Sequence, residues 1–506
     1  MDFSLIWMIN SYIVRCQQKV KKMYKFKTKP YDHQLSAFNN SCNAPYHALF
    51  MEMGTGKTKV IVDTMGSLFE NNKVTHALVV APKGVFDNWV QLEIPAHLPE
   101  RIKRYVVRWQ PNFTNKYKEE LLKVAVPENR EPETLNILVM NVEALSTSKG
   151  SAAAYRFLEL NPDSFMVVDE STTIKNRTAA RTKSVMRCGE KARYRRILTG
   201  SPVTKSPMDL YTQCSFLSLN ALGFKSFYSF QARYAVMRRR TMGVKNFQEI
   251  VSFQRLDELS ERLDKFATRV LKEDCLDLPA KVYVRRKVEL TSEQKKLYGQ
   301  MKELALAQLD DGKLATTANV LTQIMRLHQI ACGHFQPDEQ APIQPINNNR
   351  LDELLTICEE NSGKSIIWAT WTHDIKSIEE ALTKAYGRDS VASYYGATPQ
   401  DERQKIVKEF EDVNSPLRFF VGQPSTAGYG ITLIAASTVI YYSNSYNLEH
   451  RIQSEDRAHR IGQKKSVTYI DLYSPATIDE KITQALRDKI NLAGQVLGEN
   501  LVDWLI

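Results

Sequence analysis

Short runs of almost uninterrupted apolar residues recur along the chain and constrain its fold more than any other feature. Four lie in the first half of the 506 residues and four in the last third. Runs without polar alternation are typical of strands covered on both faces, and helical spacing between them predicts parallel sheets. We therefore expect an α/β protein with two lobes. The runs span residues 76–82, 135–141, 164–170 and 195–199, then 365–370, 417–422, 438–443 and 466–472.

The composition indicates a globular chain with a polyanionic partner. Lys and Arg number 68 against 57 Asp and Glu, a formal net charge of +11, and such a surplus favours binding to a polyanion. The seven Cys include no C-x-x-C pair, which predicts a reduced, cytoplasmic protein without a structural metal. No apolar run approaches the length of a membrane span, and the apolar start lacks the marks of a signal peptide.

A region of different character separates the two sets of apolar runs. It is helix-like, interleaves aromatic and basic residues, and ends near Pro345 and an Asn-Asn-Asn run, a linker signal. Near the C-terminus, Ile478, Ile482, Leu486 and Ile490 recur every four residues and predict a helix that packs on the second lobe. The predicted parts are an N-terminal extension (1–26), a first lobe (27–204), a helical middle region (205–346), a second lobe (347–487) and a tail (488–506).

A glycine-rich turn follows a short apolar run and opens a helical pattern, which is the setting of a phosphate-binding loop. Glycines let backbone N–H groups converge on phosphate oxygens, and the helix N-terminus adds partial positive charge. Lys57 is expected to bridge the β- and γ-phosphates, and the Thr58 hydroxyl to hold Mg²⁺. The generic pattern has a glycine where this chain has Met51. The predicted nucleotide-binding residues of the turn are Gly54, Thr55, Gly56, Lys57 and Thr58.

Two further motifs carry charged side chains. Asp169 and Glu170 end an apolar run, and a carboxylate at the end of a parallel strand lies where open α/β sheets bind ligands. We expect Asp169 to hold Mg²⁺ and Glu170 to deprotonate the attacking water. Arg457 and Arg460 are three residues apart and share one helical face, where they could reach a γ-phosphate. From spacing alone, a solvated basic face is the better interpretation of that pair.

Together these motifs resemble superfamily-two helicases and, within them, the Swi/Snf-type ATPases, from about Lys29 to Leu497. The stretch Asp456–Gln463 (D-R-A-H-R-I-G-Q) is nearly diagnostic, and the middle region also follows the family pattern. The resemblance implies two RecA-like lobes with helical insertions between them and a C-terminal helix. It implies ATP and Mg²⁺ as cofactors and makes Arg457 and Arg460 arginine fingers. Further implied roles are adenine or nucleotide contact for Tyr31, Gln34 and Gly430, and coupling of hydrolysis to movement for Thr199, Gly200, Ser201 and Gln453.

The resemblance also implies contacts with DNA, although this sequence departs from the family motifs at several positions. The implied DNA-binding residues are Lys83, Asn141, Trp371, Thr398 and Thr426. Ser171-Thr172 replaces the second half of the family's D-E-A/G-H motif, Tyr429 replaces a Gly, and Thr432 replaces an Asn. Three basic runs, at 19–29, 177–196 and 231–245, are expected to line a DNA track through phosphate contacts. The aromatic residues beside the last run have near-helical spacing, which favours a core role over base stacking.

The leading prediction is an ATP-driven motor that moves along double-stranded DNA without sequence preference. A helicase or branch-migration enzyme that acts on forks or junctions uses the same motifs and is the alternative. A DNA-binding protein with an inactive ATPase is disfavoured because the residues of the ATP site are all present. A fused nuclease or methylase is disfavoured because the motor motifs occupy the chain. Residues 1–22 belong to no motif and are predicted to be dispensable for hydrolysis.

Overall fold

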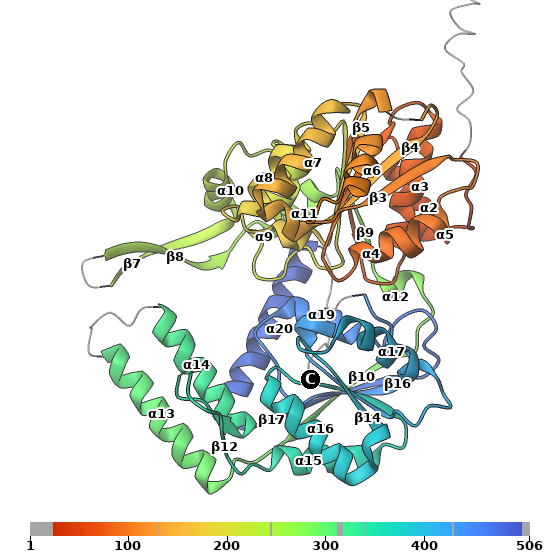
Figure 1. Cartoon of the computed structure of the whole chain (residues 1–506). Helices are drawn as coiled ribbons and strands as arrows, with labels where there is room; N and C mark the ends of the chain where they lie inside the picture. Colours follow the sequence, from red (N-terminus) through yellow and green to blue (C-terminus); the bar gives the residue numbers. More distant parts are fainter. Residues whose placement is uncertain are drawn as a thin grey trace, which may run out of the picture.

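Two separate parallel sheets form the framework of the molecule, one in each lobe (Figure 1). The computed structural model describes residues 24–129, 131–242, 245–310, 317–338, 340–427 and 430–497. This arrangement confirms the predicted α/β class with two parallel-sheet lobes, and each of the eight predicted apolar runs overlaps a strand. The prediction for residues 1–22 lies outside the described residues.

Within the described residues, seven strands form the sheet of the first lobe, and all of them pair in parallel. Leu78 and Val80 belong to the core on one face of this sheet, whereas Val79 and Ala81 belong to the core on the other. Both faces are therefore covered, as the apolar runs predicted. The strand order is β3 (Arg104–Arg108), β4 (Leu135–Asn141), β2 (His76–Ala81), β5 (Ser164–Asp169), β6 (Tyr194–Leu198), β1 (Tyr46–Met51) and β9 (Ala267–Val270).

The sheet of the second lobe has six strands in the part of the chain that is described, again all parallel. Ile367 faces one core cluster, and its neighbours Ile366 and Trp368 face the other. The order is β10 (Lys281–Lys287), β17 (Val467–Tyr473), β16 (Ala436–Tyr441), β13 (Lys364–Trp368), β15 (Phe419–Gly422) and β14 (Val391–Tyr394).

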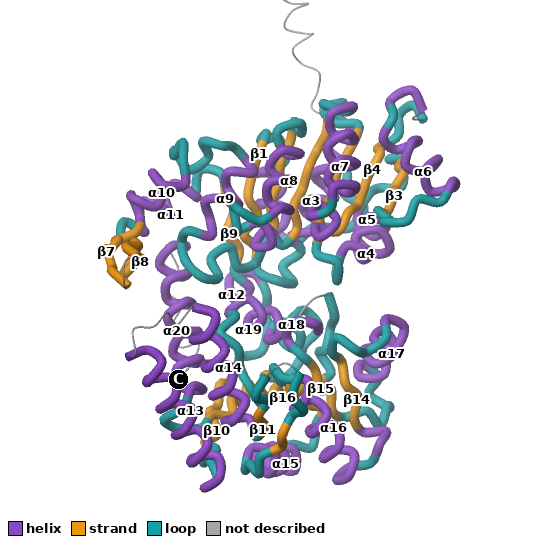
Figure 2. Tube along the Cα trace, turned by 60° about the vertical axis from the view of Figure 1, so that its left-hand side comes forward, coloured by secondary structure: helices purple, strands orange, loops and turns teal. Residues whose placement is uncertain are grey.

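Helices flank the sheets of both lobes (Figure 2). No helix in the described ranges is both long enough and apolar enough to cross a membrane. The first lobe carries α2 (Asp32–Ser41), α3 (Lys57–Glu70), α4 (Phe86–Asn88), α5 (Ile94–His97), α6 (Asn115–Ala125), α7 (Ser148–Leu160), α8 (Ala180–Gly189) and α9 (Asp209–Leu217). The second lobe carries α15 (Arg350–Glu360), α16 (Thr372–Tyr386), α17 (Gln400–Glu411), α18 (Pro424–Ala427) and α19 (Leu448–Glu455).

The region between the two sets of apolar runs is more mixed than the sequence indicated. It contains the expected helices, but β9 extends the first sheet, β10 extends the second, and two strands form a separate antiparallel hairpin. Because β9 and β10 are edge strands with several polar residues, they lack the apolar run of a central strand. The region comprises α10 (Phe227–Tyr234), β7 (Ala235–Met242), β8 (Lys245–Phe253), α11 (Leu256–Leu263), α12 (Lys272–Cys275), α13 (Ser292–Asp310), α14 (Thr317–Cys332), β11 (His334–Phe335) and β12 (Gln344–Pro345).

The C-terminal helix α20 (Ile478–Leu497) contacts both lobes. The four isoleucine and leucine positions predicted from spacing form a small core with Leu448 of the second lobe. Further along the helix, however, Ala493 and Val496 belong to the main core of the first lobe. Residues 488–497, expected to begin a tail, are therefore a helical extension that joins the lobes (Figure 1).

Candidate functional site

The glycine-rich turn lies between β1 and α3, as the sequence predicted. Gly54 and Gly56 both have a φ of 86°, the left-handed region that favours glycine. A Cβ at Gly56 would lie 2.2 Å from Nε2 of Gln34, so this position has room for glycine alone. Lys57 begins α3 and its side chain is buried, so its ammonium group is held at the N-terminus of the helix.

The motif expected to contact adenine lies against this turn. Gln34 Nε2 donates to the carbonyl of Thr55 at 3.1 Å, and its Oε1 accepts from the backbone N–H of Tyr31 at 3.1 Å. His33, which the sequence did not single out, places its Nε2 2.8 Å from the same Thr55 carbonyl. The ring of Tyr31 is 56 % exposed and parallel to that of His33, with centroids 5.8 Å apart. A flat exposed ring beside the turn is suited to stacking on a base.

The two predicted carboxylates are buried at the end of β5. Trp89 Nε1 donates to Oδ2 of Asp169 at 2.9 Å, and Lys57 Nζ lies 3.6 Å from Oε1 of Glu170. Burial raises the pKa of both carboxyls, and the charge of Lys57 opposes that rise. Glu170 has a φ of 46°, a costly conformation for a residue with a side chain.

The segment expected to couple hydrolysis to movement reaches the same carboxylate. Thr199 Oγ1 donates to Glu170 Oε2 at 3.3 Å and accepts from the backbone N–H of Ser201 at 3.1 Å. A Cβ on Gly200 would lie 3.2 Å from the backbone nitrogen of Met53, so a glycine lets this segment approach the turn closely. The structure therefore brings the turn, the carboxylates and the coupling segment together within the first lobe.

Both predicted arginines come from the second lobe and lie beside the turn of the first. The guanidinium of Arg457 contacts the sulfur of Met53 and donates to the carbonyl oxygens of Gln453 at 2.8 Å and Ile431 at 2.9 Å. Arg460 donates to Thr432 Oγ1 at 2.9 Å, and its Cβ lies 3.7 Å from where a Cβ on Gly54 would be. Two cations from the second lobe thus stand at the phosphate loop.

Several hydrogen bonds and ion pairs connect the two lobes, and the sequence did not predict them. Glu449 of α19 accepts from Thr172 Oγ1 at 2.9 Å and from Lys175 at 3.3 Å. Lys272 donates its backbone N–H to Glu52 Oε2 at 2.9 Å, and its Nζ lies 2.5 Å from Asp456 Oδ1. Thr172, a departure from the family motif, therefore connects the Glu170 segment directly to the second lobe.

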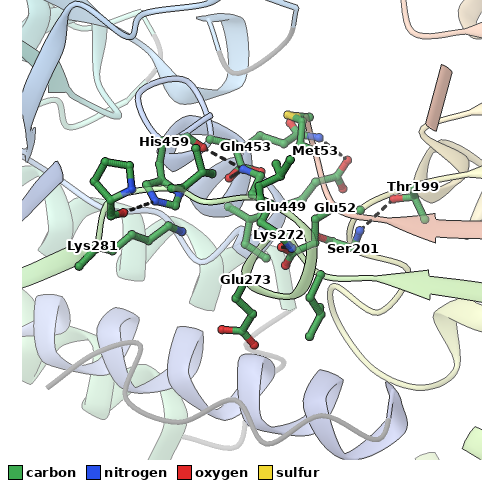
Figure 3. Close-up of a pocket in the computed structure, with 18 of the residues that line it drawn as sticks. Glu52, Met53, Thr199, Ser201, Lys272, Glu273, Lys281, Glu449, Gln453 and His459 are labelled. Carbon is green, nitrogen blue, oxygen red and sulfur yellow. Dashed lines mark hydrogen bonds and ion pairs between the residues drawn. The ribbon is translucent and has the colours of Figure 1, made fainter. Parts of the chain in front are cut away.

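A cavity of about 530 Å³ lies between the lobes (Figure 3). Its first-lobe wall includes Met53 and Thr199, its second-lobe wall includes Gln453 and His459, and the linker 271–281 closes it. Gln453 Nε2 lies 3.5 Å from Glu449 Oε1, so the predicted coupling glutamine sits within the network that joins the lobes. Among the described residues, no group of three or more His, Cys, Asp or Glu side chains is arranged to hold a metal ion directly.

The residues expected to contact DNA occupy varied environments. Lys83 is exposed just after β2, and Asn141 ends β4, where its amide donates to Glu143 at 3.1 Å. Trp371 precedes α16 and is half-buried against His328 and His334. The Thr398 hydroxyl is buried and donates to the carbonyl of Ser393 at 3.1 Å, and that of Thr426 lies 3.4 Å from Gln423 Oε1.

Gly430, expected at the nucleotide, lies against the first lobe. It has a φ of 74°, and a Cβ there would be 3.1 Å from the carbonyl oxygen of Gly84. Tyr429, which replaces a glycine of the family motif, lies outside the described residues. Thr432, which replaces an asparagine of that motif, supplies the hydroxyl that accepts a hydrogen bond from Arg460.

The basic run 177–196 is partly structural. Arg196 is fully buried and donates to the carbonyl oxygens of Ser41 and Ala44, and Arg177 lies over the ring of Phe227 at 4.8 Å. The aromatic residues nearby largely confirm the core interpretation, since Phe230 and Tyr234 are fully buried, although Tyr228 is 66 % exposed.

Two family models match the chain. The SNF2-related domain matches residues 12–336, and the helicase conserved C-terminal domain matches residues 347–462. The first match covers more than half of the chain and ends just after β11. The chain therefore belongs to the SNF2-related family.

Curated relatives share this family and are considerably longer. The chain is similar to a probable ATP-dependent DNA helicase, CHR12, of Arabidopsis thaliana, at 26 % identity over 97 % of this chain and 44 % of the relative. It is 26 % identical to the SWI/SNF chromatin-remodeling complex subunit snf22 of Schizosaccharomyces pombe, over 93 % of this chain and 28 % of the relative. An uncharacterized ATP-dependent helicase of Mycoplasma pneumoniae is also 26 % identical, over 89 % of this chain and 40 % of the relative. The chain thus spans less than half the length of these relatives.

Among solved structures, the chain is similar to the Sulfolobus solfataricus SWI2/SNF2 ATPase core in complex with dsDNA. The match covers 94 % of each chain at 24 % sequence identity, with a TM-score of 0.41.

Proposed function

We propose that this chain hydrolyses ATP and uses the reaction to move along double-stranded DNA. The observation that carries the proposal is the meeting of two lobes at one phosphate loop. Lys57 and Glu170 of the first lobe lie 3.6 Å apart, and Arg457 of the second lobe contacts Met53 of the same loop. A site completed by both lobes can couple hydrolysis to their relative movement.

The residues present suit a nucleotide with Mg²⁺. The glycines at 54 and 56 keep side chains out of the loop, and Lys57 at the start of α3 would hold the β- and γ-phosphates. The Thr58 hydroxyl and the Asp169 carboxylate, steadied by Trp89, would hold Mg²⁺. When bound, the ion neutralises charge that develops on the phosphate oxygens.

Each remaining residue has a separate task in this proposal. Glu170 accepts the proton of the attacking water, with one oxygen near Lys57 and the other hydrogen-bonded to Thr199. Arg457 and Arg460 supply positive charge to the transferring phosphoryl group when the lobes close. Glu449 and Gln453 relay that closure to the Glu170 segment through Thr172.

Double-stranded DNA is the proposed track because the net charge is +11 and the family includes DNA helicases and chromatin-remodelling subunits. The contacts would be to phosphates and independent of sequence. Lys83 and Asn141, at the carboxyl ends of β2 and β4, are the proposed contacts in the first lobe. Trp371 and Thr426, after β13 and β15, are the proposed contacts in the second. We place this activity in the cytoplasm.

The direct test is the rate of ATP hydrolysis by the purified chain without DNA, with single strands, with blunt duplex, with forks and with four-way junctions. The proposal requires strong stimulation by blunt duplex. Stimulation confined to forks or junctions would favour a branch-migration enzyme, and no hydrolysis with any DNA would leave only a binding role.

A further inference from the structure

The hairpin β7–β8 belongs to neither parallel sheet and projects from the first lobe, on the side where α13 and α14 project from the second (Figures 1 and 2). Its strands pair from Ala235 opposite Phe253 to Met242 opposite Lys245. A two-stranded ribbon of this kind has a shape that fits the major groove of a DNA duplex, which is about 12 Å wide.

The base of the hairpin is firmly anchored in the first lobe. Tyr234 is fully buried where α10 runs into β7, and its backbone carbonyl accepts from Gln254 at 2.9 Å. Glu258 of α11 accepts hydrogen bonds from Tyr234, Arg233 and Arg262. The base of the ribbon is therefore fixed to the first lobe.

The ribbon carries exposed arginines on both faces. Arg238, Arg239 and Arg240 are consecutive and exposed, and successive side chains of a strand point to opposite faces. Arg240 pairs with Glu249 at 2.5 Å, the only acid in the sequence from 235 to 253. Glu249 lies opposite Arg238 in the strand register, but within the part of the chain that the structure describes neither Arg238 nor Arg239 forms an ion pair.

We propose that the β7–β8 ribbon enters the major groove of double-stranded DNA and grips the phosphates of both strands. Arg238 and Arg240 face one strand, and Arg239 faces the other. The inference rests on the proposed function, because the ribbon would be a second binding site for the same duplex, outside the two parallel-sheet lobes. Arginine suits this role because its planar guanidinium binds phosphate through two hydrogen bonds.

The test is the affinity for DNA without ATP, measured by fluorescence anisotropy over a series of salt concentrations. The variant is the triple substitution Arg238→Gln, Arg239→Gln and Arg240→Gln. We expect its Kd for a blunt duplex at 0.15 M salt to rise roughly tenfold or more, and the slope of log K against log salt to fall by about 2 to 3. Affinity for a single strand of equal length should fall less, because that strand has no groove.

A matched control removes three exposed basic side chains elsewhere. These are Lys103, Arg156 and Arg388, each at least half exposed. Lys103 and Arg388 precede β3 and β14, so they lie at the amino ends of the strands, opposite the end where the phosphate loop lies. Their triple substitution by glutamine changes the net charge equally and should leave the duplex Kd within about twofold. Glu249→Gln releases Arg240 and should tighten duplex binding, a gain that no folding defect can produce.

Three results would overturn the inference. The hairpin variant could bind duplex as tightly as the control, it could lose affinity for single strands and duplex equally, or it could lose strand release from forks with duplex affinity unchanged. The last result would make the ribbon a wedge. Failure of the proposed function is separate, because it would appear as wild-type ATP hydrolysis that duplex DNA does not stimulate.

Discussion

The hydroxyl of Thr199 donates a hydrogen bond to Oε2 of Glu170 at 3.3 Å, joining the end of β6 to the end of β5. The other carboxylate oxygen of Glu170 faces Lys57 at 3.6 Å. The proposed base is thus oriented from one side by the phosphate loop and from the other by the coupling segment. A shift of either element would change the position of the base.

Thr199→Val removes this hydrogen bond and keeps the shape of the side chain. We expect turnover to fall about ten- to a hundredfold, since a hydrogen bond to a charged carboxylate contributes roughly 1.5–3 kcal/mol. The Kd for ATP should change little because Thr199 is not among the proposed nucleotide-binding residues. Steady-state kinetics together with nucleotide-binding measurements check both values. Thr199→Ser keeps the hydroxyl and should restore most of the rate, and failure of that rescue would contradict the role.

Lys57→Ala and Glu170→Gln should each abolish DNA-stimulated hydrolysis for different reasons. Loss of Lys57 also weakens nucleotide binding, because its ammonium group holds the phosphates. Glu170→Gln removes only the base and should leave binding intact. Isothermal titration with ATP and a phosphate-release assay separate the two effects. A Glu170→Gln enzyme that hydrolyses ATP at nearly the wild-type rate would show that the base has been assigned incorrectly.

Arg457→Ala and Arg460→Ala should reduce turnover far more than ATP affinity. Their charge acts on the transition state after the lobes close, and such arginines contribute roughly 10³-fold or more in rate. Single-turnover kinetics at saturating ATP and duplex DNA measure the effect. Conversely, a large loss of affinity with unchanged turnover would place these side chains on the ground-state nucleotide.

Acidification should reduce turnover, and the fall should begin at a pH above the usual pKa of a glutamate. Burial raises the pKa of Glu170, and a base must be unprotonated, so activity is present above the raised pKa and lost below it. Thr199 donates to the ionised form and lowers this pKa, so Thr199→Val should move the acid limb to higher pH. The pH profile of kcat for both proteins tests this, and a movement to lower pH would contradict it.

Local patterns were predictable from the sequence. The central strands β2, β4 and β5 are buried on both faces and so consist of apolar runs, and the phosphate loop needs glycine and lysine at fixed neighbouring positions. The edge strands β9 and β10 were not recognised, because each has one neighbour in its sheet and contains arginine or lysine.

Contacts between residues far apart in the sequence could not be predicted from these local patterns. Thr172 and Glu449 are 277 positions apart, and Lys272 and Asp456 are 184 positions apart. The sequence around each of these residues does not indicate its partner, because other acidic and basic residues lie close to each of them. The lobes must be placed against each other before such pairs become visible, and the same holds for the contact of α20 with both lobes.

Displacement of the third strand from a blunt-ended triplex measures movement along intact duplex DNA most directly. With ATP, the chain should displace the third strand, and Glu170→Gln should abolish this displacement. In the same conditions it should release little strand from a long tailed duplex. Efficient release from the tailed duplex with the triplex left intact would instead make the chain a strand-separating helicase.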